Sequence, residues 1–324
     1  MPTIDIALAS YNGEKYISAQ IASIFDNDVS GAEVSLGKLI VSDNVSTDKT
    51  AEIVSDICYA HPELRLHINH RRGVIHNFNY ALAQTDAGYV MLADQDDVWH
   101  NNKIALSLQK MQELERQFGT NVPLLVFTDL AVTDHQLTVI SSSFFAYQKI
   151  DPVAYVRPES LFLYNVAPGC TMMLNRRLLE MALPVPDGAV MHDWWLMLVA
   201  GVFGHIGHVG QATMYYRQHD NNQIGASVSS FWEKLFSPRK KLQLAQKNLQ
   251  DAVRQARLFS AQFPVIPVEF SSTLGFLTEF NHLSRWRRVR GLMQEKMISP
   301  TFWGRVLLYA VAVFSPVLSR VSQR

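Results

Sequence analysis

Short hydrophobic runs alternate with stretches of helical periodicity along the first part of the chain. The strand-like runs occupy residues 4–9, 38–42, 64–68, 89–93 and 124–128. Apolar residues at helical spacing occupy residues 16–25, 50–59, 74–83 and 102–117. Strands and helices joined in this order by short loops form βαβ units, whose strands are parallel. The pattern therefore predicts an α/β fold with a mainly parallel, Rossmann-like sheet flanked by helices.

Later in the chain the strand signals fade. A helix is predicted at 194–203 and a short strand at 212–216, whereas residues 140–170 give no clear pattern. The remaining segments with helical spacing or continuous apolar character are 242–261, 274–296 and 302–318. The sequence thus predicts a first domain at residues 1–226 and a mostly helical C-terminal extension at residues 227–324.

Charge divides the chain at the same place. From Ser227 onward there are fifteen Lys and Arg but five Asp and Glu, so the extension carries +10 and the rest of this neutral chain −10. Such asymmetry suggests that the two parts meet different partners. The two cysteines, Cys58 and Cys170, form no disulfide framework, so a cytoplasmic compartment is expected.

The strongest chemical signal is the acidic segment after the strand at 89–93. Asp94, Asp96 and Asp97 lie within four residues and repel one another unless a cation or solvent offsets them. Carboxylate oxygens are the ligands that Mg²⁺ or Mn²⁺ takes when it bridges a protein to a diphosphate. The alternative is a solvated turn in which Asp97 caps the next helix.

A second carboxylate, Asp43, follows the strand at 38–42. It can accept a hydrogen bond from a nucleotide base or a ribose hydroxyl, or it can form an Asx-turn before the next helix, with Asp48 as the cap. Because ligands sit beyond the carboxyl ends of parallel strands, the loops at 10–13, 43–48 and 94–97 are expected to line one crevice.

Two further segments carry candidate groups. Asp193 stands among aromatic residues that would desolvate it, as a general base requires, although it could also cap the helix that follows. After the predicted strand at 212–216, Arg217 could pair with phosphate and His219 could ligate a metal. A lone histidine in a purely structural role is the alternative for His219.

Several competing functions lack their signatures. The sequence contains no G-x-G-x-x-G after the first strand, no G-x-x-x-x-G-K-[ST] and no G-x-S-x-G. The motifs of dinucleotide-binding enzymes, P-loop nucleotidases and α/β-hydrolases are therefore missing.

Five segments together resemble family 2 glycosyltransferases of the GT-A fold. They are Ala9-Ser10-Tyr11-Asn12-Gly13, Asp43-Asn44-Val45-Ser46-Thr47-Asp48, Ala93-Asp94-Gln95-Asp96-Asp97-Val98-Trp99, Pro168-Gly169-Cys170-Thr171-Met172 and His192-Asp193-Trp194-Trp195. The segment Tyr216-Arg217-Gln218-His219 is similar to the bacterial branch often labelled rhamnosyltransferase, whose members build surface polysaccharides. The Gln-x-x-Arg-Trp motif of processive members is absent, which favours the addition of a single sugar.

The resemblance implies roles for individual residues in binding the donor. Ala9 and Tyr11 would flank the base, and Asp43 would hydrogen-bond it. Arg71 or Arg72 would touch the diphosphate.

The resemblance also implies how the reaction is catalysed. Asp96 would bind the metal, and Asp94 the metal or the ribose. His219 would be a further metal ligand or diphosphate contact. Asp193 would deprotonate the acceptor hydroxyl.

These roles describe a metal-dependent inverting glycosyltransferase that uses Mg²⁺ or Mn²⁺. The expected partners are a nucleotide-diphosphate sugar, with UDP or dTDP as carrier, and a glycan or lipid-linked glycan acceptor, without nucleic acid. The basic extension would contact the cytoplasmic face of the inner membrane or a second copy of the chain. The alternative functions are a sugar-phosphate nucleotidyltransferase and a non-catalytic scaffold that binds a sugar nucleotide.

Overall fold

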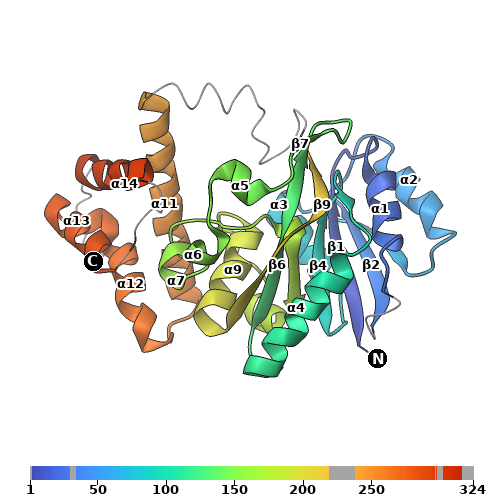
Figure 1. Cartoon of the computed structure of the whole chain (residues 1–324), viewed down its shortest axis with the longest axis horizontal. Coiled ribbons are helices and arrows are strands. Elements are labelled where there is room, and N and C mark those ends of the chain that lie inside the picture. The colour runs from blue at the N-terminus through green and yellow to red at the C-terminus, as the bar shows by residue number, and fades with distance from the viewer. Residues whose placement is uncertain (1, 30–33, 219–237, 296, 298–301, 316–324) are drawn as a thin grey trace.

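The protein is built around one nine-stranded sheet, seen in a computed structural model that describes residues 2–29, 34–218, 238–295, 297 and 302–315 (Figure 1). The strand order is β3-β2-β1-β4-β8-β6-β9-β5, and β7 pairs with β6. The strands are β1 (Thr3–Ser10), β2 (Ser35–Asp43), β3 (Leu64–Ile68), β4 (Tyr89–Asp94), β5 (Val98–Trp99), β6 (Leu124–Thr133), β7 (Val139–Ser141), β8 (Met172–Asn175) and β9 (His205–Arg217).

The first four strands are mutually parallel, as the βαβ pattern predicts. β1 lies between β2 and β4, and β2 pairs with β3. The sheet then changes direction, because β8 runs antiparallel to both β4 and β6, whereas β9 is parallel to β6. β9 is also longer than the predicted strand at 212–216 and pairs at its far end with the two residues of β5. This pairing holds the acidic segment between β4 and β9.

Both faces of the sheet are covered by helices, so its strands alternate apolar residues between two cores. On β1, Ile4, Ile6 and Leu8 face the core with α1 (Ile17–Phe25), α2 (Thr50–Cys58) and α4 (Lys103–Phe118). Ala7 faces the other core, with α3 (Val74–Ala83), α8 (Arg176–Ala182) and α9 (His192–Phe203).

The segment that gave no clear pattern contains short helices. They are α5 (Phe144–Gln148), α6 (Pro152–Tyr155), α7 (Pro158–Leu161) and the 3₁₀ helix η1 (Gly169–Thr171). Local capping explains one of them: the Asp151 carboxylate accepts hydrogen bonds from the first turn of α6, whose first residue is Pro152. Such one-turn helices are too short to give a periodic signal.

The C-terminal extension is helical and lies at one end of the molecule, opposite the α1 and α2 side (Figure 1). Its helices are α11 (Pro238–Gln262), α12 (Val268–Glu279), the 3₁₀ helix η2 (Phe280–His282), α13 (Arg285–Gln294) and α14 (Phe302–Phe314). α11 shares a core with the α/β part, because the Phe259 and Trp195 ring centroids are 5.6 Å apart. None of the helices in the described ranges is long and apolar enough to cross a membrane. The predicted domain boundary at 226/227 lies outside the described residues and stays a prediction.

The single helix predicted at 274–296 is wrong, because the chain breaks it between α12 and α13. The Arg288 guanidinium is buried and donates hydrogen bonds of 2.9 Å each to the carbonyls of Phe280, Asn281 and Ser315. These bonds satisfy the backbone where the helix turns and tie the break to the end of α14.

Candidate active site

The loops after β1, β2 and β4 meet at one edge of the sheet, as predicted. In the strand register Ser10 lies opposite Asp43, and Ala9 lies opposite Asp94. Ala9 is partly buried against the core, whereas Tyr11, which follows the strand, is 44% exposed. The phenol ring of Tyr11 is therefore free to stack on a planar ligand.

Gln95 ties two of these loops together. Its amide oxygen accepts a hydrogen bond from the Tyr11 backbone N–H at 2.8 Å, and its amide nitrogen donates to the Tyr11 carbonyl at 3.0 Å. A Cβ atom at Gly13 would lie only 2.3 Å from the Gln95 Oε1 atom. Glycine at position 13 thus leaves the space that this reciprocal pair needs. Sequence reasoning treated Gln95 only as the spacer between two aspartates.

Asp43 forms the Asx-turn considered as an alternative. Its carboxylate accepts from the Ser46 N–H at 2.8 Å, from the Ser46 hydroxyl and from the Ser10 hydroxyl at 3.1 Å. The residue is 1% exposed. An ionised carboxylate has about four acceptor positions, so one remains for a ligand. The base contact stays a prediction. Asp48 accepts from the Thr50 N–H at 3.0 Å and so supports the start of α2.

Three buried amides form a network that sequence reasoning missed. The Asn44 side chain donates to the carbonyls of Asn69 and Arg71 at 2.8 and 3.0 Å, and Asn77 donates to the Ser10 carbonyl at 3.1 Å. Asn69 accepts from the Arg71 N–H at 3.0 Å. The network fixes the loop between β3 and α3 against the other loops. Its signal in the sequence is an asparagine directly after β2 and another directly after β3, with Asn77 inside α3.

The predicted diphosphate contacts Arg71 and Arg72 lie on that loop and are exposed. The Arg71 guanidinium pairs with Asp187, and the Nδ1 atom of His76 lies 3.6 Å from the same carboxylate. The segment around Asp187 therefore closes over the β3–α3 loop. The pairing places the long cationic side chain of Arg71 at the edge of the site. Its contact with the diphosphate stays a prediction.

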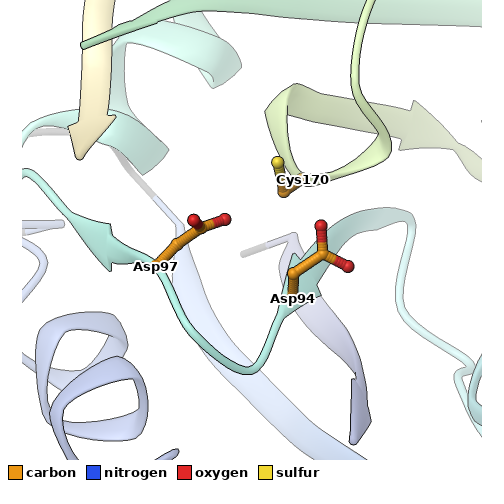
Figure 2. A group of neighbouring side chains, drawn as sticks. All are labelled: Asp94, Asp97 and Cys170. Atoms are coloured by element: carbon orange, nitrogen blue, oxygen red, sulfur yellow. The ribbon is translucent and has the colours of Figure 1, made fainter. Parts of the chain in front are cut away.

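The acidic segment lies against a cysteine that the predicted set of metal ligands did not include, and that prediction stays untested. Asp94 and Asp97 approach the thiol of Cys170 on η1, with one ligand atom from each within 4.8 Å of the others (Figure 2). Burial, and then the charges of Asp96 and Asp193, raise the pKa of Asp94 to about 7. Burial also raises the pKa of Asp97 well above its usual range. Excess negative charge of this kind suits a bound divalent cation.

Asp97 does not cap the next helix, because Asn102 stands at the N-cap of α4 and makes no side-chain cap bond. The Asp97 carboxylate is fully buried, and its Oδ2 atom has no hydrogen-bond partner among the described residues. Lys103 lies nearby, also fully buried, with its ammonium 5.0 Å from the Trp99 ring centroid. Burial lowers the pKa of Lys103 to about 8, and the negative charge of Asp97 opposes that shift.

Arg217 clamps the same segment from β9. Its N–H lies 3.3 Å from an Asp97 carboxylate oxygen, and its guanidinium donates to the Asp96 carbonyl at 2.9 Å. The guanidinium also stacks over the Tyr16 ring, 4.6 Å from the centroid, and the residue is 6% exposed. In this arrangement Arg217 positions the acidic loop, and the predicted phosphate contact stays a prediction. His219, the other group predicted here, lies outside the described residues.

Asp193 lies in the first turn of α9, whose N-cap is Met191, so it is not the cap. Its carboxylate accepts from the Asn165 amide at 2.9 Å, the Gly169 N–H at 3.1 Å and the Trp194 N–H at 2.7 Å. The tryptophans bury the helix, as expected, but hydrogen bonds rather than apolar walls surround the carboxylate. Gly169, which donates to this carboxylate, precedes Cys170, whose thiol approaches Asp94 and Asp97, so Asp193 and the acidic segment lie in the same site.

Residues 5–166, half of the chain, match the family model described as Glycosyl transferase family 2. The chain belongs to glycosyl transferase family 2. This family membership accounts for the order of the segments after β1, β2 and β4 and for the fold that carries them.

Relatives of this glycosyltransferase are themselves named as sugar transferases. The chain is 26% identical to a dTDP-rhamnosyl transferase, RfbG, of Shigella flexneri, over 68% of this chain and 75% of the relative. It is 26% identical to WfgD of Escherichia coli, a UDP-Glc:alpha-D-GlcNAc-diphosphoundecaprenol beta-1,3-glucosyltransferase, over 55% of this chain and 62% of the relative.

Solved structures show the same GT-A fold. TarS residues 1–349 of S. aureus, in complex with UDP, superimpose with a TM-score of 0.52 at 14% identity, covering 96% of this chain and 90% of TarS. A mannosyltransferase of Pyrobaculum calidifontis, in complex with GDP-Man and Mn²⁺, gives a TM-score of 0.54 at 17% identity, covering 98% and 82%. The family 2 glycosyltransferase therefore has the predicted GT-A architecture with additional C-terminal helices.

Proposed function

We propose that this family 2 glycosyltransferase moves one sugar from a nucleotide-diphosphate sugar to a hydroxyl of a glycan acceptor, with inversion at the anomeric carbon. The observation that carries the proposal is the loop at 169–170, in which Gly169 donates to the Asp193 carboxylate and Cys170 approaches Asp94 and Asp97 at the carboxyl end of β4. The activities for which RfbG and WfgD are named support a dTDP- or UDP-sugar as donor.

The donor nucleotide is placed by the loops that Gln95 and the amide network hold together. The half-exposed Tyr11 ring stacks on the base, and the remaining acceptor position of Asp43 takes a base N–H. Asp94 and Asp96 would hold Mg²⁺ or Mn²⁺, which would offset the charge of the diphosphate leaving group. The surplus of negative charge around Asp94 fits such an ion, whereas the Cys170 thiol is a softer ligand than either ion prefers.

Asp193 acts as the general base. It takes the proton of the acceptor hydroxyl while the hydroxyl oxygen forms a bond to the anomeric carbon and the bond from that carbon to the diphosphate oxygen breaks. The oxygen attacks opposite the leaving group, so the configuration inverts. The three N–H donors around the carboxylate stabilise its ionised form, which is the form that can accept a proton.

Asp193→Asn tests this assignment, because it keeps the size of the side chain but removes the base. Transfer from UDP- or dTDP-sugars should fall by a factor on the order of 10² to 10⁴. Calorimetric affinity for the nucleoside diphosphate in Mn²⁺ should remain, since the donor loops are untouched. Near-normal turnover would show that another group removes the proton. Loss of transfer together with loss of nucleotide binding would point to a folding defect instead.

We further propose that a lipid-linked acceptor is met at a membrane surface by the exposed face of α13, formed by Arg285, Trp286, Arg287, Arg290 and Met293. Trp286 is 83% exposed, and cations beside an exposed indole and thioether fit an anionic lipid surface. Arg288, in the middle of the same basic run, is buried and does not belong to this face.

Vesicle flotation distinguishes binding of this face to a membrane from binding to a second copy of the chain. Each arginine near an anionic surface contributes about 1 kcal/mol, so Arg287→Glu with Arg290→Glu should weaken binding to phosphatidylglycerol vesicles by at least about tenfold. Tyr59→Ala, which removes an exposed aromatic on α2's C-terminal side, is the matched control. Sedimentation that shows a dimer lost in the double variant, without vesicle binding by the wild type, would assign the face to self-association.

A further inference from the structure

Among the described residues, one side chain holds the base Asp193, and it is that of Asn165. Two of the three donors to the Asp193 carboxylate are backbone N–H groups, of Gly169 and Trp194, and the third is the Asn165 amide at 2.9 Å. Asp193 is 4% exposed, so these protein donors take the place of water around the carboxylate. Substitution can therefore alter the surroundings of the base most directly at position 165.

Within the described ranges the Asn165 amide makes one hydrogen bond, and that bond goes to the base. Its carbonyl oxygen is buried and has no hydrogen-bond partner among the described residues. The reverse orientation of the amide would set that oxygen against a carboxylate oxygen, so the orientation is determined by Asp193. An unsatisfied buried carbonyl is destabilising, so the stability of the loop does not explain an amide here.

The loop that carries Asn165 reaches the acidic segment as well. Four residues later Gly169 contacts the base, and the next residue, Cys170, approaches Asp94 and Asp97. A Cβ atom at Gly169 would lie 2.8 Å from the His192 ring and 3.4 Å from the Asp193 Cβ atom. Glycine thus permits the close approach, and the segment 165–170 sets the base relative to the acidic segment.

We propose that Asn165 is a positioning residue for the general base. It fixes the direction of the Asp193 carboxylate and favours its ionised form by donating a hydrogen bond to it. The inference rests on the proposed function, in which Asp193 removes the acceptor proton. The side chain of Asn165 is hydrogen-bonded to Asp193 and not to the described donor loops at 10–13, 43–48 and 94–97, so donor binding is predicted to be independent of it.

Two substitutions of similar size test the proposal. Asn165→Leu removes the donor, and Asn165→Asp places a second carboxyl beside the base. In both, kcat should fall about ten- to a hundredfold, because a displaced catalytic group loses alignment. The acidic limb of the pH profile of kcat/KM should move to higher pH by about one unit, because the ionised carboxylate loses a hydrogen bond. The calorimetric Kd for UDP or dTDP should not change.

Thr171→Val is the matched control. It removes a hydrogen bond of 2.7 Å, from the Thr171 hydroxyl to the Pro168 carbonyl, within the same loop and without touching Asp193. It should lower the melting temperature but leave the pH profile in place.

The proposal is overturned if the pH profiles of the Asn165 variants coincide with that of the wild type. It is also overturned if their loss of kcat equals that of Thr171→Val, because Asn165 would then only support the structure of the loop. If Asn165→Leu does not fold, the pH profile and kcat of Asn165→Asp still test the proposal, since this substitution keeps the shape of the side chain. Asp193→Asn separates this outcome from failure of the proposed function. Retained turnover in that variant overturns the base itself, whereas lost turnover with an unmoved Asn165 profile overturns only the positioning role.

Discussion

The reciprocal bonds between Gln95 and Tyr11 predict that donor affinity depends on a residue that has no charge and no place in the D-x-D pair. Gln95→Ala removes both hydrogen bonds, of 2.8 and 3.0 Å. Each such bond contributes about 0.5–1.5 kcal/mol, and partial exposure of Gln95 favours a total of about 1–2 kcal/mol. If the bonds order the two loops for the nucleotide, affinity falls by about five- to thirtyfold.

Gly13→Ala should reproduce this loss from the other side. The new Cβ would meet the end of the Gln95 side chain at 2.3 Å, and that flexible end can move away only by giving up its bonds to Tyr11. The substitution itself should be mild, because the Gly13 N–H can keep its bond of 2.7 Å to the Thr50 hydroxyl. The free energy lost in Gly13→Ala should therefore not exceed the free energy that the two Gln95–Tyr11 hydrogen bonds contribute.

A double-mutant cycle measured by calorimetry of UDP or dTDP in Mn²⁺ decides the question. If Gly13 serves only to admit Gln95, Gly13→Ala has little further effect in the Gln95→Ala background, and the coupling energy equals the single loss. Gln109→Ala, on the exposed side of α4, is the control for removal of a glutamine side chain. Additive losses, or unchanged affinity in Gln95→Ala, would refute the reasoning.

Three further predictions concern stability and the acidic segment. The pKa of Asp94 is raised from 3.8 to about 7, so between these values the folded protein binds more protons than the unfolded chain and its stability falls as pH rises. Asp94→Asn removes this titration, so in metal-free buffer it should raise the melting temperature more at about pH 8 than at about pH 4. An equal change in melting temperature at the two pH values would contradict the raised pKa of Asp94. Arg217→Met should cost about 3 kcal/mol in denaturant unfolding and weaken Mn²⁺-dependent nucleotide binding, because the carbonyls of Asp96 and His135 lose the guanidinium that donates to them. Arg217→Lys should not restore it, since an ammonium lacks the planar fork, and full recovery would argue for charge alone. At the other end of the sheet, Asp5 accepts hydrogen bonds from the backbone N–H groups of Lys38, Asp86 and Ala87 at 2.7, 2.8 and 3.0 Å. Asp5→Ala should therefore lower the melting temperature without changing nucleotide affinity. A parallel loss of affinity would show that the two ends of the sheet are coupled.

Hydrophobic periodicity predicted the parallel half of the sheet closely. Buried parallel strands such as β1 are apolar at most positions, and the helices between them carry a regular apolar stripe. The 3₁₀ helix η1 and helices α5 to α7 were not predicted, because single turns are specified by caps and tertiary contacts rather than by periodicity. The break at 280–284 escaped prediction for another reason: it is stabilised by Arg288, a residue whose type and position suggest an exposed helical face.

The site shows the same division. The three loops that gather at the carboxyl ends of β1, β2 and β4 could be predicted, because sheet topology brings them together whatever their sequence. The residues that orient them could not. Arg217 and Asn165 reach the acidic segment and the base from β9 and from an irregular segment, and only the folded register shows which polar groups they meet.

The three carboxylates of the acidic segment also differ in ways that the sequence does not predict. In the sequence Asp94, Asp96 and Asp97 are equivalent, and charge repulsion alone assigns the metal to all of them. In the fold, pairing of β5 with β9 turns Asp97 inward, where it is fully buried beside the Arg217 N–H and the Lys103 ammonium. An inward carboxylate near a fixed cation anchors the segment, whereas Asp94 and Asp96 remain partly exposed. Under the proposed function these two would be the carboxylates that hold the metal at the diphosphate, and the third aspartate would serve as their anchor.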